Sequence, residues 1–262
     1  MANVKVEKPA NQSVTKILQV MAILADSKTL MRLQDVAVGV NMPQATCLRY
    51  LNALIKEGYV FQDYDSGWYS LTWGVCNLGE KVRAHQSIRT LSGDIVNRLS
   101  VDLEMGICLV VERDMECMYL DCLYDPASEG MDLMRIGKQT PLHASSSGKI
   151  LLTEYSDTAL DKLVEEKGLT SLTSKTITTK SALAQELDFV RKQGYALDNE
   201  ECEDGLRCVA VPVYDFTGKA VVAISAFGST ERVTDAAIKK EILPALQAAA
   251  KELSFRMGNS FA

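Results

Sequence analysis

Residues 31–73 constrain the fold of this chain more than any other stretch, because helix and strand signals follow one another there in a fixed order. Apolar spacing predicts a short helix over residues 33–38 and a longer one over residues 44–57. The pattern then changes to two short strands, at residues 59–61 and 68–71, with a polar turn between them. Two helices joined by a short turn and followed by a hairpin predict a winged helix-turn-helix.

The longer helix has clear ends and one apolar face. Pro43 suits the first helical turn, where its missing N–H is no loss, and Gly58 suits the position just past the end. Helical spacing predicts that five side chains of this helix are buried: Cys47, Leu48, Leu51, Leu54 and Ile55. The helix is therefore expected to pack on a small core and to leave its N-terminal part exposed.

The exposed N-terminal part of this helix predicts contacts with DNA, because this end of a recognition helix reaches base edges in the major groove. Arg49 has the donors to read guanine or to hold a phosphate, and Gln44 suits adenine. Side chains at the hairpin tip are placed to brace the sugar–phosphate backbone. The predicted DNA contacts are Gln44, Ala45, Thr46, Arg49, Tyr50, Tyr64 and Ser66. The alternative is a small helical subdomain whose hairpin docks a partner protein.

Length and charge indicate a second domain and a dimer. A chain of 262 residues is too long for a winged helix alone. The net charge of −6 argues against a protein that simply coats nucleic acid. Residues 1–75 carry 7 Lys/Arg and 6 Asp/Glu, whereas the remainder carries 21 and 28. The N-terminal part is therefore only weakly basic, and tight DNA binding is expected to need dimerisation.

The seven cysteines are scattered and form no C-x-x-C pair, which predicts reduced thiols rather than a disulfide framework. Several of them lie in apolar runs, as small core residues do. The N-terminus lacks the apolar core of a signal peptide, and no 18-residue apolar run predicts a membrane-spanning helix. We therefore expect a cytoplasmic protein without a membrane partner.

The N-terminal region divides into three expected parts. Residues 1–12 are a polar tail, and residues 13–73 form the winged helix-turn-helix domain, with Ser13 as the cap of a first helix. A helical pattern without proline predicts a linker helix over residues 74–91. Its apolar side chains cannot be buried by the helix alone. They would pack either on the same helix of a second copy in a dimer or on the second domain of the same chain.

The second domain is expected over residues 92–262. Strands are predicted at residues 106–112, 117–123, 131–136, 195–198, 206–214 and 220–227, and helices at 148–155, 159–166, 180–193 and 236–257. Pro244 predicts a bend or break within the last helix. Strands, then helices, then strands indicate an α+β domain built on an antiparallel sheet.

Residues 140–149 bring three serines, Ser145, Ser146 and Ser147, to the start of a helix. The free N–H groups and the positive dipole end of a helix N-terminus suit a carboxylate or a phosphate. The stretch is not a P-loop, because His143 stands where the first Gly is needed. The simpler interpretation is a helix cap, with His143 as a hydrogen-bonded structural residue.

Residues 198–213 carry a second group of polar side chains. Strand alternation places Leu206, Cys208 and Ala210 on one face and Arg207 on the other. In the next strand Ser225 and Phe227 share a face. The acidic run over residues 200–204 is most simply a solvated loop.

Enzymatic chemistry is not expected. Cys208 with His143 as its base would have the right residue types for a nucleophile. A cysteine inside an apolar strand is usually inert, however. We therefore predict no catalytic residue, no metal site and no cofactor.

Several motifs together resemble the IclR family (isocitrate lyase regulator type) of bacterial transcription regulators, over about residues 13–258. The matching motifs are residues 42–49 (MPQATCLR), 57–59 (EGY), 68–71 (WYSL), 141–144 (PLHA) with Gly148 and Lys149, Gly194 and Tyr195 with residues 198–201 (DNEE), 205–212 (GLRCVAVP) and 223–225 (AIS). Each motif alone is unspecific, but the set in this order is highly specific.

The resemblance implies a winged helix-turn-helix, a linker helix and a C-terminal GAF-like effector-binding domain. Such proteins act as dimers or tetramers on palindromic operator DNA, as repressors or activators of catabolic operons. They sense small-molecule effectors, often organic, aromatic or sugar acids, so a carboxylic acid effector is expected. The family's pocket positions correspond here to Ser146, Ser147, Asp198, Leu206, Cys208 and Ser225. The alternative is a metabolite-binding enzyme whose winged helix serves protein contacts.

The chain departs from the family pattern in both expected sites. The family often has Gly or Ala where Ser146 and Ser147 stand, and a second Ser where Phe227 stands, which suggests more hydroxyl donors and an aromatic wall. In the recognition helix, Gln44, Ala45 and Leu48 replace the commoner Lys, Ser and His, whereas Thr46 and Arg49 match.

Overall fold

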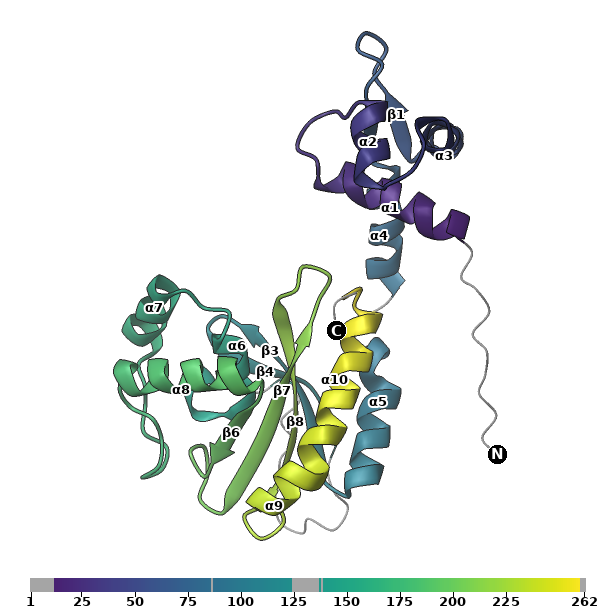
Figure 1. Ribbon diagram of the computed structural model, residues 1–262. Coiled ribbons are helices and arrows are strands. Elements are labelled where there is room, and N and C mark those ends of the chain that lie inside the picture. The colour runs from purple at the N-terminus through teal and green to yellow at the C-terminus, as the bar shows by residue number, and fades with distance from the viewer. Residues whose placement is uncertain (1–11, 86, 124–136, 138, 260–262) are drawn as a thin grey trace, which may run out of the picture. The chain divides into compact units, whose positions relative to one another are not determined.

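The computed structural model describes residues 12–85, 87–123, 137 and 139–259, and the chain forms two compact units, residues 1–87 and 88–262 (Figure 1). Among the helices of these described residues, none is both long enough and apolar enough to span a membrane. The described part of the N-terminal unit has one hydrophobic core, and that of the C-terminal unit has two.

The N-terminal unit confirms the predicted winged helix-turn-helix. It contains α1 (Gln12–Asp26), α2 (Leu33–Gly39) and α3 (Gln44–Lys56), followed by the antiparallel strands β1 (Val60–Gln62) and β2 (Tyr69–Leu71). A common core contains Val20 from α1, Val36 from α2, Cys47 and Leu51 from α3, and Tyr69 from β2. The three helices and the hairpin therefore fold as one packed unit. Ser13, the expected cap, lies inside α1.

The expected single helix over residues 74–91 is two helices, α4 (Gly74–His85) and α5 (Ile88–Leu103). The apolar residues of this stretch separate into two groups, which explains the break. Ile88 and Leu91 pack against the core of the C-terminal unit, whereas Leu78 and Val82 on α4 are exposed. Residues 88–91 therefore belong to the first helix of the C-terminal unit.

The C-terminal unit is an α+β domain on an antiparallel sheet, as predicted. Its strands are β3 (Gly106–Arg113), β4 (Glu116–Leu123), β5 (Gln139–Pro141), β6 (Ala196–Asn199), β7 (Leu206–Tyr214) and β8 (Ala220–Ser229). Within the described residues they pair in the order β5-β4-β3-β8-β7-β6. The sequence pattern missed the three-residue strand β5. The strand expected over residues 131–136 lies outside the described residues.

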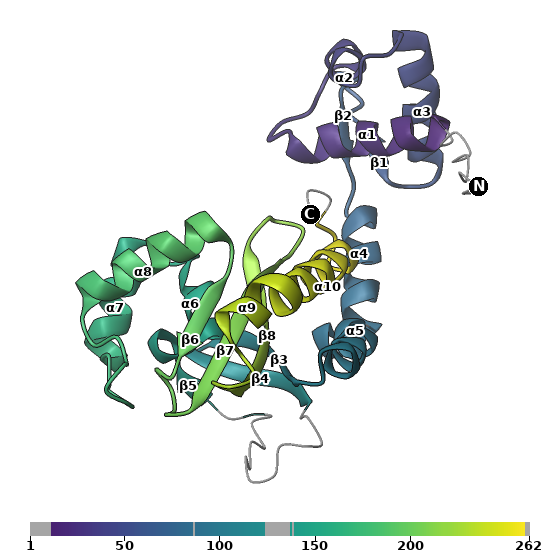
Figure 2. The same cartoon turned by 60° about the horizontal axis from the view of Figure 1, so that its bottom comes forward.

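Helices cover both faces of this sheet (Figures 1 and 2). α6 (Ser146–Leu152), α7 (Asp157–Lys167) and α8 (Lys180–Gln193) lie on the side that we call the α6 face. α5 and α10 (Leu243–Arg256) lie on the opposite side, the α10 face. Since neighbouring residues of a strand point to opposite faces, Cys208 joins the core of the α6 face and Val209 joins that of the α10 face.

The last helical segment breaks near Pro244, as predicted. α9 (Asp235–Ala237) leads into a π-helical turn, Ile238–Ile242, and α10 then begins with Pro244 in its first turn. Proline is tolerated there because its missing N–H costs no hydrogen bond within the new helix. Arg256 at the other end of α10 forms paired hydrogen bonds of 2.6 and 2.7 Å with the Asp94 carboxylate on α5.

The sequence predicted reduced thiols and no disulfide framework, and one pair of cysteines departs from the reduced thiols. Cys108 and Cys122 are joined by a disulfide between β3 and β4. The sequence spacing of 14 residues gave no hint of it, but the antiparallel register places the two residues opposite one another, with Cα atoms 4.2 Å apart. Facing side chains of such a pair lie close enough to meet.

Candidate functional site

Helix α3 presents its N-terminal end to solvent. Gln44, Ala45 and Arg49 are exposed, and Thr46 and Tyr50 are half-buried. The apolar face of the helix packs into the N-terminal core, which fixes the direction of the exposed face. The side chains predicted to contact DNA from this helix therefore share one accessible surface, and the base contacts themselves stay a prediction.

The buried stripe of α3 is narrower than expected. Cys47, Leu51 and Leu54 are buried, and Ile55 is half-buried, but Leu48 is 36% exposed. Successive residues of an α-helix are separated by about 100°, so Leu48 projects away from the stripe that begins at Cys47. Leu48 therefore belongs to the same surface as Ala45, three residues earlier.

Tyr50 is more restrained than a free surface side chain. A hydrogen bond with the Ser13 side chain on α1 lowers the pKa of Tyr50. The Arg49 guanidinium carbon lies 5.5 Å from the centre of the Tyr50 ring, within reach of a cation–π contact. Tyr50 is thereby held against α1 and beside Arg49.

The β1–β2 hairpin, which we call the wing, carries two of the predicted DNA contacts, Tyr64 and Ser66. Tyr64 at the tip is 99% exposed. Ser66 instead stabilises the turn, because its backbone N–H and its hydroxyl both donate to Asp63 Oδ1, over 2.8 and 2.6 Å. The same hydroxyl hydrogen bond lowers the pKa of Asp63. Tyr64 is therefore the freer of the two to meet a DNA backbone.

The expected effector residues gather on the α6 face of the sheet. In the antiparallel register Cys208 on β7 lies opposite Asp198 on β6 and opposite Phe227 on β8. Ser225 lies two residues before Phe227 on the same face of β8, opposite Cys108 on β3. The residues Ser146, Ser147, Asp198, Leu206, Cys208, Ser225 and Phe227 are all buried. The effector assignment stays a prediction, but the fold places these residues under one layer of helices.

The start of α6 is a capped helix end. The backbone N–H of Gly148 donates to Ser145 Oγ over 3.0 Å, so Ser145 is the cap, and Ser146 and Ser147 are the first helical residues. Gly148 is required at this point, because a Cβ there would lie 2.0 Å from the carbonyl oxygen of Leu142. This close approach fixes α6 against the preceding segment.

The His143 ring contacts the backbone of a neighbouring loop. Its Nε2 lies 3.0 Å from the carbonyl oxygen of Thr170, and burial lowers its pKa. The ring is thus bonded to the backbone of the loop that follows α7, in line with the structural interpretation of this residue.

The Phe227 ring fills space next to β3. A Cβ on Gly106 would lie 2.2 Å from the ring, so the ring lies directly over this glycine. Phe227 is buried and belongs to the core of the α6 face. The ring therefore packs against β3, and its role as an aromatic wall for an effector stays a prediction.

Asp198 is a buried carboxylate held by the backbone. Its Oδ1 accepts hydrogen bonds from the N–H groups of Glu201, over 2.8 Å, and Cys202, over 3.3 Å. Burial raises the pKa of Asp198 to about 6, although these two hydrogen bonds oppose the rise. Burial therefore holds this carboxyl closer to its neutral form than an exposed aspartate.

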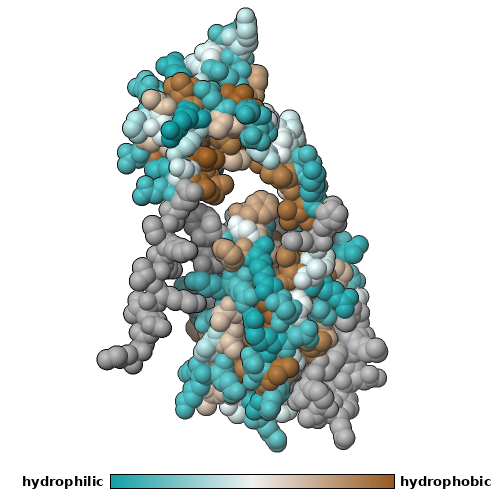
Figure 3. Space-filling view, turned by 90° about the vertical axis from the view of Figure 1, so that its right-hand side faces the viewer, coloured by the Kyte–Doolittle hydropathy of each residue, from teal (hydrophilic) through white to brown (hydrophobic). Residues whose placement is uncertain are grey.

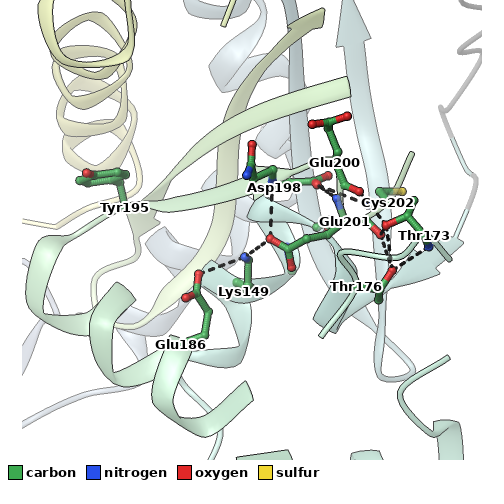
Figure 4. Close-up of polar contacts among 12 residues, drawn as sticks. Lys149, Thr173, Thr176, Glu186, Tyr195, Asp198, Glu200, Glu201 and Cys202 are labelled. Carbon is green, nitrogen blue, oxygen red and sulfur yellow. Dashed lines mark hydrogen bonds and ion pairs between the residues drawn. The ribbon is translucent and has the colours of Figure 1, made fainter. Parts of the chain in front are cut away.

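A buried lysine next to Asp198 was not expected from the sequence. Lys149 on α6 is 1% exposed, and its Nζ lies 2.7 Å from Glu201 Oε1 and 3.0 Å from Glu186 Oε1 (Figure 4). The interpretation of the acidic run as a solvated loop was therefore wrong for Glu201, which is buried. A lone lysine among the apolar residues of a short helix is the signal that could have pointed to this pair.

A separate cavity of about 420 Å³ lies against α10. Val211, Tyr214, Gln247, Lys251 and Ser254 are among the residues that line it, and it shares none with the expected effector set. Val211 belongs to the core of the α10 face. This cavity is therefore distinct from the site on the α6 face.

Comparisons with protein families match both units. The sequence profile of the bacterial transcriptional regulator IclR C-terminal domain matches residues 80–255, and that of the IclR helix-turn-helix domain matches residues 13–63. KdgR, an HTH-type transcriptional regulator of Escherichia coli strain K12, is 32% identical over an alignment that covers 98% of this chain and 98% of KdgR.

Solved structures show the same architecture. The IclR structure from Thermotoga maritima has 26% sequence identity and a TM-score of 0.62, and the match covers 94% of this chain and 99% of that chain. The inducer-binding domain of a PobR double mutant from Acinetobacter, in complex with 3-hydroxybenzoic acid, has 29% identity and a TM-score of 0.60. That match covers 64% of this chain and 98% of the PobR chain.

The relatives XynR, KdgR and AllR of Escherichia coli strain K12 are named as transcriptional regulators or repressors, so the alternative of a metabolite-binding enzyme is not supported. The two profiles together span most of the chain, in the same order as the two units of the structure. The chain therefore belongs to the IclR family of bacterial transcriptional regulators.

Proposed function

We propose that this protein regulates a catabolic operon by binding a palindromic operator as a dimer or tetramer, and that a small organic, aromatic or sugar acid changes this binding. The observation that carries the proposal is the gathering of the polar effector residues on the α6 face in a chain whose other unit exposes a recognition-type helix. We expect the protein to act in the cytoplasm.

Dimerisation is supported by charge and by exposed apolar side chains. A winged helix that is nearly neutral gains too little from phosphate contacts to bind tightly alone, so two copies on one operator are needed. Apolar surface is visible on the N-terminal unit (Figure 3). Among the exposed apolar residues of this unit are Val14, Leu18, Leu78 and Val82, each about half exposed or more. These side chains suit a contact between two copies of the chain.

A carboxylic acid is the proposed effector class. Ser146, Ser147 and Ser225 offer hydroxyl donors on the α6 face, and Phe227 offers an aromatic wall for the body of the ligand. The complex of the PobR domain with 3-hydroxybenzoic acid supports an aromatic acid in particular. Differential contacts in two arrangements of the dimer, with a coupling of about 1–3 kcal/mol, would be sufficient for such a switch.

The test is binding of the purified protein to the DNA upstream of its own coding region at fixed salt, measured by fluorescence anisotropy with and without a panel of organic and aromatic acids. Specific binding that one acid strengthens or weakens is the expected result. Binding that no acid changes would remove the effector part of the proposal, and absence of specific binding would remove the operator part.

Two sets of variants separate the two sites. Arg49→Ala should weaken operator binding by roughly 1–3 kcal/mol per half-site and leave ligand binding intact. Lys56→Ala, which removes a positive charge from the other end of α3, is the matched control. Cys208→Phe or Ser225→Leu should remove the ligand response and keep DNA binding. DNA affinity that survives Arg49→Ala, or an unaltered ligand response in the pocket variants, would refute the respective assignment.

A further inference from the structure

Lys149 is the centre of a buried ionic group that joins three segments of the C-terminal unit (Figure 4). It comes from α6, and it contacts Glu186 on α8 and Glu201 in the connection between β6 and β7. Thr176 Oγ1 donates to the carbonyl oxygen of Glu201 over 2.7 Å, and Thr173 Oγ1 donates to that of Glu200 over 2.7 Å. The segment that contains Glu201 is therefore fixed from several sides.

A buried ionic group adds little net stability to a fold. Burying an ion pair removes two charges from water, and apolar residues of similar volume often stabilise a protein as well or better. Glu201 Oε2 is buried and has no hydrogen-bond partner among the described residues, so its carboxylate is only half satisfied. Stability alone therefore does not account for the pair.

The pair acts on Asp198 through the backbone and through charge. The N–H groups of Glu201 and Cys202 donate to Asp198 Oδ1, so the position of the segment decides where this carboxyl is held. The negative charge of Glu201 opposes ionisation of Asp198, and the positive charge of Lys149 favours it. The other titratable groups around this site are Cys202, Cys208 opposite Asp198, Glu186 beside Lys149, and His143, which is within reach of the charge of Glu201.

We propose that Lys149 and Glu201 are positioning residues for effector binding, which hold Asp198 in place and set the protonation state in which it meets the effector. This inference rests on the proposed function, because it assumes that Asp198 contacts the effector. Lys149 and Glu201 themselves are not assigned a contact with it.

Removing the charge of Glu201 and removing the charge of Lys149 should shift the titration of Asp198 in opposite directions. A merely structural role of the two residues would not produce opposite shifts. Glu201→Gln keeps the size of the side chain and removes its negative charge, so Asp198 should titrate at lower pH than in the wild type. Lys149→Met keeps a similar length and removes the positive charge, so Asp198 should titrate at higher pH. The charge of Glu201 raises the pKa of Asp198 and the charge of Lys149 lowers it, so the two variants should move the midpoint in opposite directions.

The experiment is a pH titration of the ligand-free, full-length protein labelled with ¹³C at the aspartate carboxyl carbons. The NMR signal of Asp198 is assigned by its loss in Asp198→Asn. Glu186→Gln is the matched control, because Glu186 contacts Lys149 but is on α8, and it should shift the midpoint far less than Glu201→Gln. If Lys149→Met fails to fold, Glu201→Gln still decides the outcome. An unchanged Asp198 midpoint in Glu201→Gln, or a shift to higher pH, would overturn the proposal.

A second measurement connects the midpoint to effector binding, with 3-hydroxybenzoate as the probe. The pH at which its affinity changes should move with the Asp198 midpoint in Glu201→Gln, by about the same number of pH units. A shifted NMR midpoint with an unshifted affinity profile would overturn the role in effector binding. Failure of the wild type to bind 3-hydroxybenzoate at any pH would overturn the proposal for an aromatic acid effector, and the DNA experiment then decides separately whether the proposed function fails.

Discussion

Asp198 is an acidic residue whose chemistry depends strongly on its buried position. Its pKa is raised to about 6, first because it is buried and then because of the neighbouring charge of Glu201. An acid whose pKa is higher in the folded than in the unfolded chain stabilises the fold when it is protonated. This contribution is complete below the ordinary value of 3.8 and is lost as the pH rises through 6.

The pH dependence of stability should therefore differ between the wild type and Asp198→Asn. As the pH falls from 7.5 to 5, the free energy of unfolding of the wild type should rise by about 1–1.5 kcal/mol relative to the variant. Urea unfolding at a series of pH values measures this difference. His143 acts in the opposite direction, because burial lowers its pKa, and it is present in both proteins. Parallel pH profiles would contradict a buried, protonatable Asp198.

At this scale the sequence predicted which side chains share a face but not which of them pair. Strand alternation alone placed Leu206, Cys208 and Ala210 together, and all three belong to the core of the α6 face. The contact between Lys149 and Glu201 joins residues 52 positions apart, so it depends on how α6 meets the β6–β7 connection. No local pattern carries that information.

Elements with strong local signals were predicted to the residue. β7 has the predicted bounds because a long alternating run fills it, and α8 ends where Gly194 adopts a left-handed φ of 77°. The α4–α5 break was missed because the helical pattern continues across it, and β5 was missed because its three residues, Gln139–Pro141, include none of the aromatic or aliphatic side chains that mark β1 and β2. In both cases tertiary packing decided the structure.

The start of α6 offers a test at the scale of an element. Gly148→Ala should destabilise the protein by roughly 2–4 kcal/mol, because the new Cβ would meet the backbone of Leu142 at 2.0 Å. Gly93→Ala in α5 is the control, since nothing lies within 4 Å of its Cβ position, and it should stabilise by roughly 0.5–1 kcal/mol. Thermal or urea unfolding measures both. Equal effects of the two substitutions would refute the close approach at Gly148.

For the whole molecule, the exposed apolar residues of α4 predict self-association. Leu78 and Val82 lie one helical turn apart and are 48% and 56% exposed. Replacing both by Gln should weaken the dimer at least ten-fold, because burial of such side chains is worth about 1.5–3 kcal/mol each when complete. Glu80→Gln, on the other side of the helix, is the control. Sedimentation velocity over a range of concentrations gives the result, and an unchanged association constant would place the dimer contact elsewhere.

The sheet of the C-terminal unit serves two cores with alternate residues of the same strands. Cys208 and Ala210 project to the α6 face, while Val209 and Val211 project to the α10 face, against α5 and α10. A designer of a genetic biosensor can use this separation directly. If the α6 face holds the effector, as we propose, randomising the positions of β7 and β8 that face α6 should change ligand preference. The intervening positions, which pack against α5 and α10, would then be left unchanged to preserve the fold.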